Sequence, residues 1–174
     1  MSKTHRRSQA LQRYNKQRQR NLLAQPGPHD CVVVLDHLKA GFNVAKIFRS
    51  AQAFGAREVH LIGIGPFDPA PAKGAFKAVP ARFHEAFAPC HAELHDRGYR
   101  LYTLEPGCGE CLFDAALPRQ SAFIFGHEEL GISFERTAYP DVLPLTIPQF
   151  GPMQSLNVSI AASIVMYEYV RRHR

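Results

Sequence analysis

The sequence lacks the features that mark several common classes of protein. None of its 174 residues is tryptophan and only four are cysteine, which is too few for a disulfide scaffold at this length. No apolar run approaches the roughly 20 residues of a membrane-spanning helix. The basic N-terminus is not followed by the apolar stretch of a secretory signal peptide. We therefore expect a cytoplasmic protein, and its 45% hydrophobic content suffices for one folded domain.

Several catalytic and binding fingerprints are also absent. Gly63 and Gly65 follow an expected strand, but Asp68 stands where a dinucleotide-binding GxGxxG motif needs glycine. No Gly-Lys-Ser/Thr sequence forms a P-loop, and no GxSxG forms a nucleophile elbow. A single CxxC occurs without a second ligand pair, so we expect no metal site; its cysteines and the upstream candidates are Cys108, Cys111, Cys90, His91 and His95.

Acidic residues are absent from the first twenty positions, although the whole chain has 21 basic and 15 acidic residues and a net charge of +6. The basic residues there are Lys3, Arg6, Arg7, Arg13, Lys16, Arg18 and Arg20. The C-terminus adds Arg171, Arg172 and Arg174, which leaves the body with 11 basic and 15 acidic residues. Basic ends on an acidic body favour contact with nucleic-acid phosphates. The alternatives for the N-terminal segment are a solubilising tail or an arm that orders on a partner subunit.

The chain divides into a short extension and one domain. Residues 1–24 have helical spacing, with Leu11, Tyr14, Arg18 and Leu22 near one face. The sequence QPGP at 25–28 interrupts that pattern. We therefore expect a basic N-terminal extension over residues 1–28 and a domain over residues 29–174.

Strands and helices are expected to alternate through the domain. Apolar runs predict strands at 31–35, 58–64, 99–104, 121–125 and 142–145, and helical spacing predicts helices at 42–54, 90–97 and 155–172. Residues 65–80, rich in proline and glycine, are expected to form a loop. This alternation predicts an α/β domain with a mostly parallel sheet flanked by helices. Ligands of such sheets bind beyond the carboxyl ends of the strands.

Polar residues at those strand ends have structural and functional interpretations. Asn43 is placed to cap a helix or to contact a ligand, and Arg49 to face solvent or a substrate. Loops 105–109 and 126–131 combine glycine with carboxylates, as ordinary turns and ligand-binding loops both do. The loop 147–157 ends in the last helix, where Ser155 is expected to act as the cap and Asn157 to lie in the first turn.

Three of these loops carry longer motifs in a fixed order. They are NVAKIFRSA at 43–51, FGHEELGIS at 125–133 and IPQFGPMQSLNVSIA at 147–161. These segments resemble motifs one, two and three of the SpoU (TrmH) family of RNA ribose methyltransferases, in the SPOUT superfamily. The resemblance spans roughly residues 30–169. It departs from the usual pattern at Ser50, at His127 and at Gln149-Phe150, none of which is a proposed catalytic residue.

The resemblance implies a fold, a cofactor and a substrate. The family's α/β sheet ends in a deep C-terminal trefoil knot, and its members act as homodimers. Its cofactor is S-adenosylmethionine, and the matching backbone positions for the adenosine and neighbouring groups are Leu104, Gly126, Ile147 and Leu156. Its substrate is a ribose 2′-hydroxyl of tRNA or rRNA, and the absence of room for a separate RNA-binding domain favours tRNA. The sulfonium already activates the methyl group, so no metal is expected.

The resemblance also assigns roles in the reaction. Arg49 matches the family's proposed activator of the 2′-hydroxyl. Because the pKa of arginine is above about 12, Arg49 is a poor base. Either it stabilises a developing alkoxide, or it holds the adjacent phosphate while phosphate or water takes the proton. The groups that would orient it, the ribose and the cofactor are Asn43, Glu128, Ser155 and Asn157.

Two other functions are compatible with the sequence. One is a catalytically silent RNA-binding or assembly protein on the same fold, and the retained Arg49, Glu128, Ser155 and Asn157 weigh against it. The other is a nucleotide-dependent enzyme that uses the glycine loops, and the failed fingerprints weigh against that. The sequence leaves open which nucleotide is methylated and whether His127 contacts a ligand or only shapes its loop.

Overall fold

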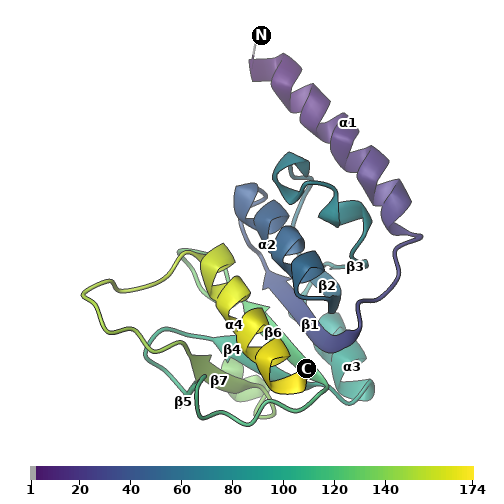
Figure 1. Ribbon diagram of the computed structural model, residues 1–174. Helices are drawn as coiled ribbons and strands as arrows, with labels where there is room; N and C mark the ends of the chain where they lie inside the picture. Colours follow the sequence, from purple (N-terminus) through teal and green to yellow (C-terminus); the bar gives the residue numbers. More distant parts are fainter. Residues whose placement is uncertain (1–2) are drawn as a thin grey trace.

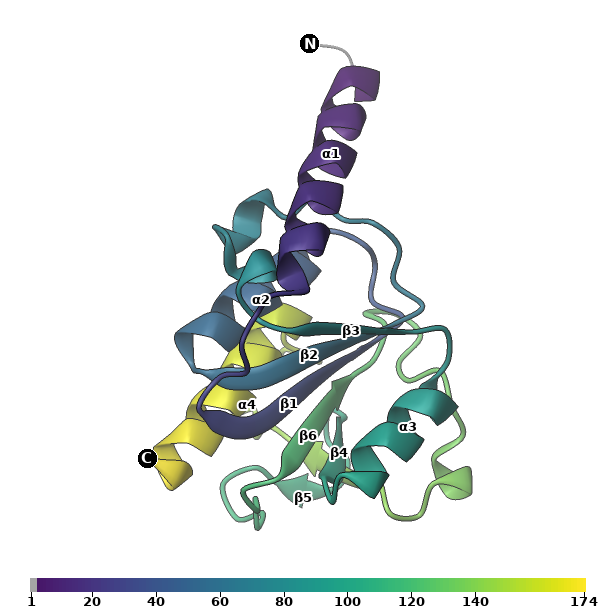
Figure 2. The same cartoon turned by 90° about the vertical axis from the view of Figure 1, so that its right-hand side faces the viewer.

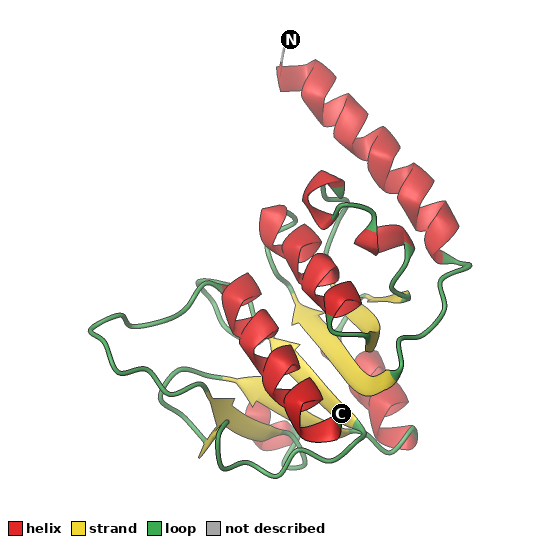
Figure 3. Cartoon of the chain, in the orientation of Figure 1, coloured by secondary structure: helices red, strands yellow, loops and turns green. Residues whose placement is uncertain are grey.

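The computed structural model describes the backbone of residues 3–174 and the side chains of residues 5–174. Residues 1–2 of the expected extension and the side chain of Lys3 lie outside it. The helices are α1 (Lys3–Asn21), α2 (Phe42–Ala53), α3 (Phe87–Asp96) and α4 (Val158–His173), shown in Figures 1 and 3. The strands are β1 (His29–Asp36), β2 (Ala56–Ile62), β3 (Ala81–His84), β4 (Arg100–Leu104), β5 (Glu110–Cys111), β6 (Ser121–Phe125) and β7 (Leu143–Thr146). Short 3₁₀ turns occupy Ala70–Ala72, Ala75–Lys77 and Arg136–Ala138.

All seven strands form one parallel sheet in the order β3-β2-β1-β6-β4-β7-β5. The central pair is in register from Cys31 opposite Ser121 to Leu35 opposite Phe125. The α/β class and the five expected strands are therefore confirmed. Because β4, β6 and β7 are neighbours and run the same way, the loops that follow them meet at one edge of the sheet.

Helices cover both faces of the sheet, as Figure 2 shows. Helices α2 and α4 lie side by side on one face, where Val44, Ile47 and Phe48 are fully buried. Helix α3 covers the other face and buries Phe87, Cys90 and Leu94. Along β1, the side chain of Val33 joins the first core and those of Val32 and Val34 join the second, as the alternation of side chains along a strand requires.

Helix α1 projects from the domain but is anchored near its end (Figures 1 and 2). Tyr14 is 2% exposed and packs between Phe67 and Phe76, with ring centroids 5.3 Å from each. The Asn21 amide donates to two backbone carbonyls and accepts from the amide of Ala81. The expected helix is confirmed over Lys3–Asn21; Leu22, which was expected to continue it, lies beyond its end and is exposed.

Two of the three C-terminal arginines, Arg171 and Arg172, make contacts within the fold. The guanidinium of Arg172 donates to the backbone carbonyls of Leu112, Phe113 and Ala115, and its side chain is only 20% exposed. Glu168 accepts hydrogen bonds from both Arg171 and Arg172. Among the described residues, the hydrogen bonds of Arg172 therefore hold the end of α4 against the turn at residues 112–115.

Replacing Glu168 with glutamine is expected to lower stability at neutral pH. Hydrogen bonds from Arg171 lower the pKa of Glu168, and burial opposes this effect. The hydrogen bonds from Arg172 and the positive charges of both arginines lower it further, so the pKa falls from 4.5 to about 2. The stabilisation is therefore present above about pH 4.5 and is lost as pH falls towards 2. We expect Glu168→Gln to cost about 1–2 kcal/mol at pH 7 and almost nothing near pH 2. Urea unfolding across this pH range measures it; the exposed Glu85→Gln is the control, and equal stability at pH 7 would contradict the prediction.

No helix among the described residues combines the length and apolar character needed to cross a bilayer. The four cysteines are all free thiols, with Cys31 and Cys90 buried and Cys108 and Cys111 partly exposed.

Candidate active site

A cavity of about 420 Å³ lies at the carboxyl ends of β4, β6 and β7. Its walls come from the loops after these strands and from the first turn of α4, and the loop between β7 and α4 is visible in Figure 3. All four expected cofactor positions line it: Leu104, Gly126, Ile147 and Leu156. Three of the expected catalytic side chains line it as well: Glu128, Ser155 and Asn157. Residues distant in sequence thus converge as the resemblance implies.

Asn43 joins this set through hydrogen bonds that cross three motifs. Its amide nitrogen donates to Glu128 Oε1 over 2.9 Å, and its amide oxygen accepts from Asn157 Nδ2 over 3.3 Å. The backbone amide of Lys39 donates to the other oxygen of Glu128. Motifs one, two and three are therefore tied together beside the cavity.

Glu128 is held in its ionised form by these contacts. Partial burial disfavours the charged carboxylate, but the hydrogen bonds from Asn43 and from backbone amides outweigh that effect and lower the pKa of Glu128. At neutral pH its carboxylate therefore accepts hydrogen bonds and has no proton to donate. This fits an orienting residue and does not fit a general acid.

The cap of α4 differs from the expected one, and of the two alternatives for Asn43 the helix cap is excluded. Asn157, not Ser155, caps α4: its Oδ1 accepts from the backbone amide and the hydroxyl of Ser159. Helix α2 starts after Gly41, so Asn43 is not a cap. Asn43 is therefore left to contact Glu128 and Asn157, and the exposed Ser155 faces the cavity.

Arg49 lies apart from the other expected catalytic residues. It is exposed on α2, does not line the cavity, and its side chain has no hydrogen-bond or ion-pair partner among residues 5–174. The next residue, Ser50, binds Ser163 of α4 over 2.8 Å, which fixes that face of α2 against α4. The structure thus presents Arg49 as an unpaired cation on a fixed helix.

The site residues expected from the sequence do not include two cavity side chains, Glu105 and Gln149, although Glu105 stands in a loop that the sequence singled out. Glu105 accepts from Thr103 Oγ1 over 2.7 Å and pairs with Arg136. Gln149 Oε1 is buried and has no hydrogen-bond partner within the described chain. Their signal is positional, because Glu105 directly follows β4 and Gln149 is the third residue of motif three.

His127 shapes the motif-two loop. Its Nδ1 accepts from the backbone amides of Glu129 and Leu130, and its backbone pairs with that of Gly131. The neutral ring therefore carries its proton on Nε2. The ring has a structural role even though the residue also lines the cavity.

The cavity fits S-adenosylmethionine by its size and its chemistry. Its volume lies in the usual range of small-molecule sites. Apolar walls from Leu104, Ile147 and Leu156 suit a nucleoside, and the unpaired Gln149 Oε1 offers a hydrogen-bond acceptor. Carboxylates at the wall suit a cationic sulfonium; they are Glu105, Glu128 and Glu129.

A parallel sheet with a small-molecule cavity at its strand ends, walled by three motif loops, defines an α/β enzyme domain of the cofactor-binding class. Residues 30–167 match the model of the SpoU rRNA Methylase family. The chain belongs to this family.

Individual relatives agree with that membership. The chain is 30% identical over 148 residues to the tRNA (guanosine(18)-2′-O)-methyltransferase of Thermus thermophilus, across 82% of this chain and 75% of the relative. A structure described for 2-OH methylation of C/U34 on tRNA superposes with a TM-score of 0.72 at 27% identity, across 84% of this chain and 98% of that one. The AdoMet complex of the SpoU methyltransferase AviRb from Streptomyces viridochromogenes shares the fold, with a TM-score of 0.73 at 24% identity. The match covers 85% of this chain and 62% of that one.

Proposed function

We propose that this chain transfers a methyl group from S-adenosylmethionine to a ribose 2′-hydroxyl of tRNA or rRNA, with tRNA slightly favoured. The observation that carries the proposal is the convergence of all three motif loops on one cavity, lined by the four expected cofactor positions. The relative with the tRNA (guanosine(18)-2′-O)-methyltransferase name supports the choice of tRNA.

The chain's own residues divide the work between binding and orientation. When bound, S-adenosylmethionine supplies a methyl group on a positively charged sulfur. Asn43, Glu128 and Asn157 hold the cavity wall in one arrangement through their hydrogen bonds. Arg49, which has no partner in the described chain, is available to an RNA phosphate or to the negative charge that develops on the 2′-oxygen. Alignment of these groups is the main source of the rate gain.

We further propose a C-terminal trefoil knot, a homodimer and a cytoplasmic location. The knot is supported by family membership and by the position of β7 between β4 and β5. The dimer is supported by apolar side chains left exposed on α2 and α4, namely Phe42 (67%), Ile160 (52%) and Tyr167 (59%). The location is supported by a tRNA substrate and by four unpaired thiols.

A methylation assay tests the function. The full chain is incubated with methyl-labelled S-adenosylmethionine and unmodified tRNA, rRNA or DNA of matched length. We expect label in tRNA and none in DNA, since only RNA has the 2′-hydroxyl. Cofactor and RNA binding without any transfer would instead support the catalytically silent RNA-binding protein.

We propose that helix α1 contributes phosphate contacts. Its exposed cations Arg6, Arg7, Lys16 and Arg20 make no ion pair among the described side chains, whereas Arg13 pairs with Asp68. Replacing these four cations with glutamine retains Tyr14 and Arg13, which anchor α1 to the domain. Deleting the helix would remove these anchors as well. We expect weaker RNA binding. The slope of the logarithm of the binding constant against the logarithm of the salt concentration should become less steep by about 0.7–0.9 for each lost phosphate contact.

Filter binding at several salt concentrations measures that slope. The control replaces Arg57, which lies on β2 and pairs with Asp30, with glutamine. An unchanged slope in the α1 variant would refute the RNA role, and a changed oligomeric state would favour an arm that orders on a partner subunit.

A further inference from the structure

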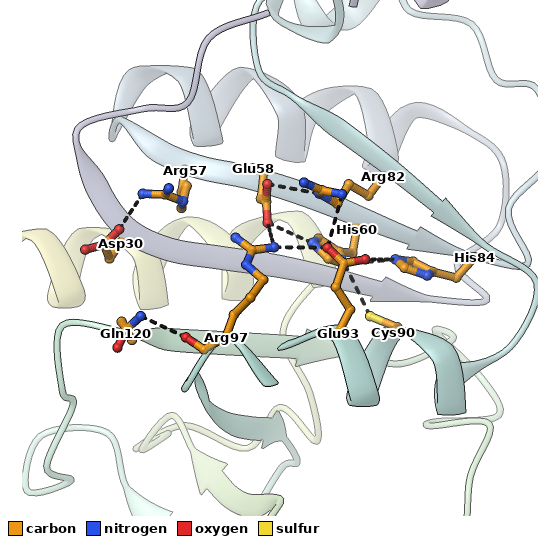
Figure 4. A network of polar contacts seen from close by, with 10 residues as sticks. All are labelled: Asp30, Arg57, Glu58, His60, Arg82, His84, Cys90, Glu93, Arg97 and Gln120. Carbon is orange, nitrogen blue, oxygen red and sulfur yellow. Dashed lines mark hydrogen bonds and ion pairs between the residues drawn. The ribbon is translucent and has the colours of Figure 1, made fainter. Parts of the chain in front are cut away.

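A second cluster of reactive side chains lies beneath α3, on the opposite face of the sheet from α2 and α4 (Figures 2 and 4). His60 projects from β2, His84 from β3 and Cys90 from α3. One donor atom of each residue lies within 4.8 Å of the other two. His60 and Cys90 are fully buried, and the His84 side chain is only 9% exposed. Three separate elements therefore bring two imidazoles and a thiol together in the interior.

The neighbours of His60 fix which of its nitrogens is free. His60 Nε2 lies 3.0 Å from Glu58 Oε1, and an ionised carboxylate only accepts hydrogen bonds. The Nε2 atom therefore carries the proton, and Nδ1 presents a lone pair to the cluster. A carboxylate behind one ring nitrogen is the arrangement that orients metal-binding histidines.

That single lone pair has two competing partners. His60 Nδ1 lies 2.9 Å from His84 Nε2 and 3.4 Å from Cys90 Sγ. One in-plane lone pair satisfies one donor well, so hydrogen bonding alone leaves the His84 or Cys90 proton poorly placed. A cation in place of these protons would contact all three atoms.

Glu93 lies beside this cluster and is the carboxylate next to His84. Its Oε1 forms ion pairs with the guanidinium groups of Arg82 and Arg97, while its Oε2 lies 4.0 Å from His84 Nε2. A Glu93 oxygen groups with Glu58 and His60 within 4.8 Å, in a set that overlaps the first at His60 and does not include Cys90. Figure 4 shows the side chains of His60, His84, Cys90 and Glu93 directed towards one another between the sheet and α3.

We propose that His60 Nδ1, His84 Nε2 and Cys90 Sγ form a structural zinc site, and that Glu93 Oε2, 4.0 Å from His84 Nε2, moves in as the fourth ligand when the metal binds. Two imidazoles, a thiolate and a carboxylate are a donor set that Zn²⁺ accepts in tetrahedral geometry. Binding releases the Cys90 thiol proton to solvent and moves the His84 proton from Nε2 to Nδ1. Four protein ligands leave no open position for catalysis, so the metal joins β2, β3 and α3 without entering the methyl transfer.

The proposal revises the expectation of no metal. That expectation considered Cys90 together with His91, His95 and the CxxC of Cys108 and Cys111. In the structure His91 binds Asp141 and Cys108 contacts Arg136. The partners of Cys90 are instead His84, six residues earlier, and His60, 30 residues earlier, on strands that the sheet brings side by side.

Cobalt binding tests the site directly. The full chain is purified under reducing conditions, stripped with a chelator and titrated with Co²⁺. We expect one equivalent to bind, with the thiolate charge-transfer band and the intense visible bands of tetrahedral cobalt, and Zn²⁺ to displace it. Zn²⁺ at 100 times its dissociation constant should raise the Tm by roughly 5–10 °C.

Two variants remove ligands and one control retains them. His84→Gln, at the partly exposed end of β3, and Cys90→Ser should both lose the spectrum and the Tm shift. The Cys108→Ser/Cys111→Ser variant should keep both. Each variant's far-UV circular dichroism and S-adenosylmethionine binding report its folding, and if Cys90→Ser does not fold, His84→Gln decides. An absence of stoichiometric binding to the wild type, or binding that survives His84→Gln, would overturn the proposal.

Discussion

Replacing Arg49 with alanine is expected to reduce single-turnover methyl transfer by about 100–1,000-fold or more while leaving S-adenosylmethionine affinity unchanged. Arg49 does not line the cavity and makes no hydrogen bond or ion pair with any described side chain. Its removal therefore leaves the cofactor site intact and takes away only the cation that we propose acts on RNA. Rapid-quench rates and calorimetric cofactor binding measure the two effects.

Two matched variants sharpen this result. Lys46→Ala removes an exposed cation one turn earlier on α2 and should leave the rate nearly unchanged. Arg49→Lys keeps the charge but loses the planar fork, so a rate as low as that of the alanine variant would favour bidentate phosphate binding. A near-wild-type rate in Arg49→Ala would contradict the proposed role.

Replacing Gly126 with alanine is expected to weaken S-adenosylmethionine binding by roughly tenfold to more than a hundredfold. A Cβ at this position would lie 2.4 Å from the carbonyl carbon and 2.6 Å from the oxygen of Gly131. Both are backbone atoms of the turn that His127 and Gly131 close, so the methyl group must push the motif-two loop open. That loop forms one wall of the cavity.

The control for this prediction is Gly65→Ala. Gly65 follows β2 away from the cavity, and an added Cβ there meets no atom within 4 Å. We expect its cofactor affinity and stability to match those of the wild type. Wild-type affinity in Gly126→Ala would show that the cofactor does not depend on this loop.

The sequence was sufficient for the sheet class and for the loops of the site, because long apolar runs and helical spacing are local signals. Strand β6 and helix α2 appear within one residue of their expected bounds. Strand β3 was missed because ARFH is short, polar and at the sheet edge, and β5 because it has two residues. Neither segment carries a pattern that differs from a loop.

Pairing between distant residues was the part that the sequence did not predict. Charge counting placed Arg172 with the RNA-contacting ends, yet it binds carbonyl groups 57–60 residues earlier in the chain. The same limit hid the cluster of His60, His84 and Cys90, since two of its residues come from neighbouring strands and the third from α3. Only family resemblance gave Arg49 a catalytic role, because an exposed arginine on a helix is otherwise ordinary.

The most direct test identifies the atom that receives the methyl group. tRNA labelled by the full chain is digested to nucleosides and analysed by mass spectrometry, and a second portion is hydrolysed in alkali. A methyl group on the 2′-oxygen blocks attack on the neighbouring phosphate, so we predict a 2′-O-methyl nucleoside and one alkali-resistant dinucleotide. Label on a base, with every linkage cleaved by alkali, would contradict ribose methylation.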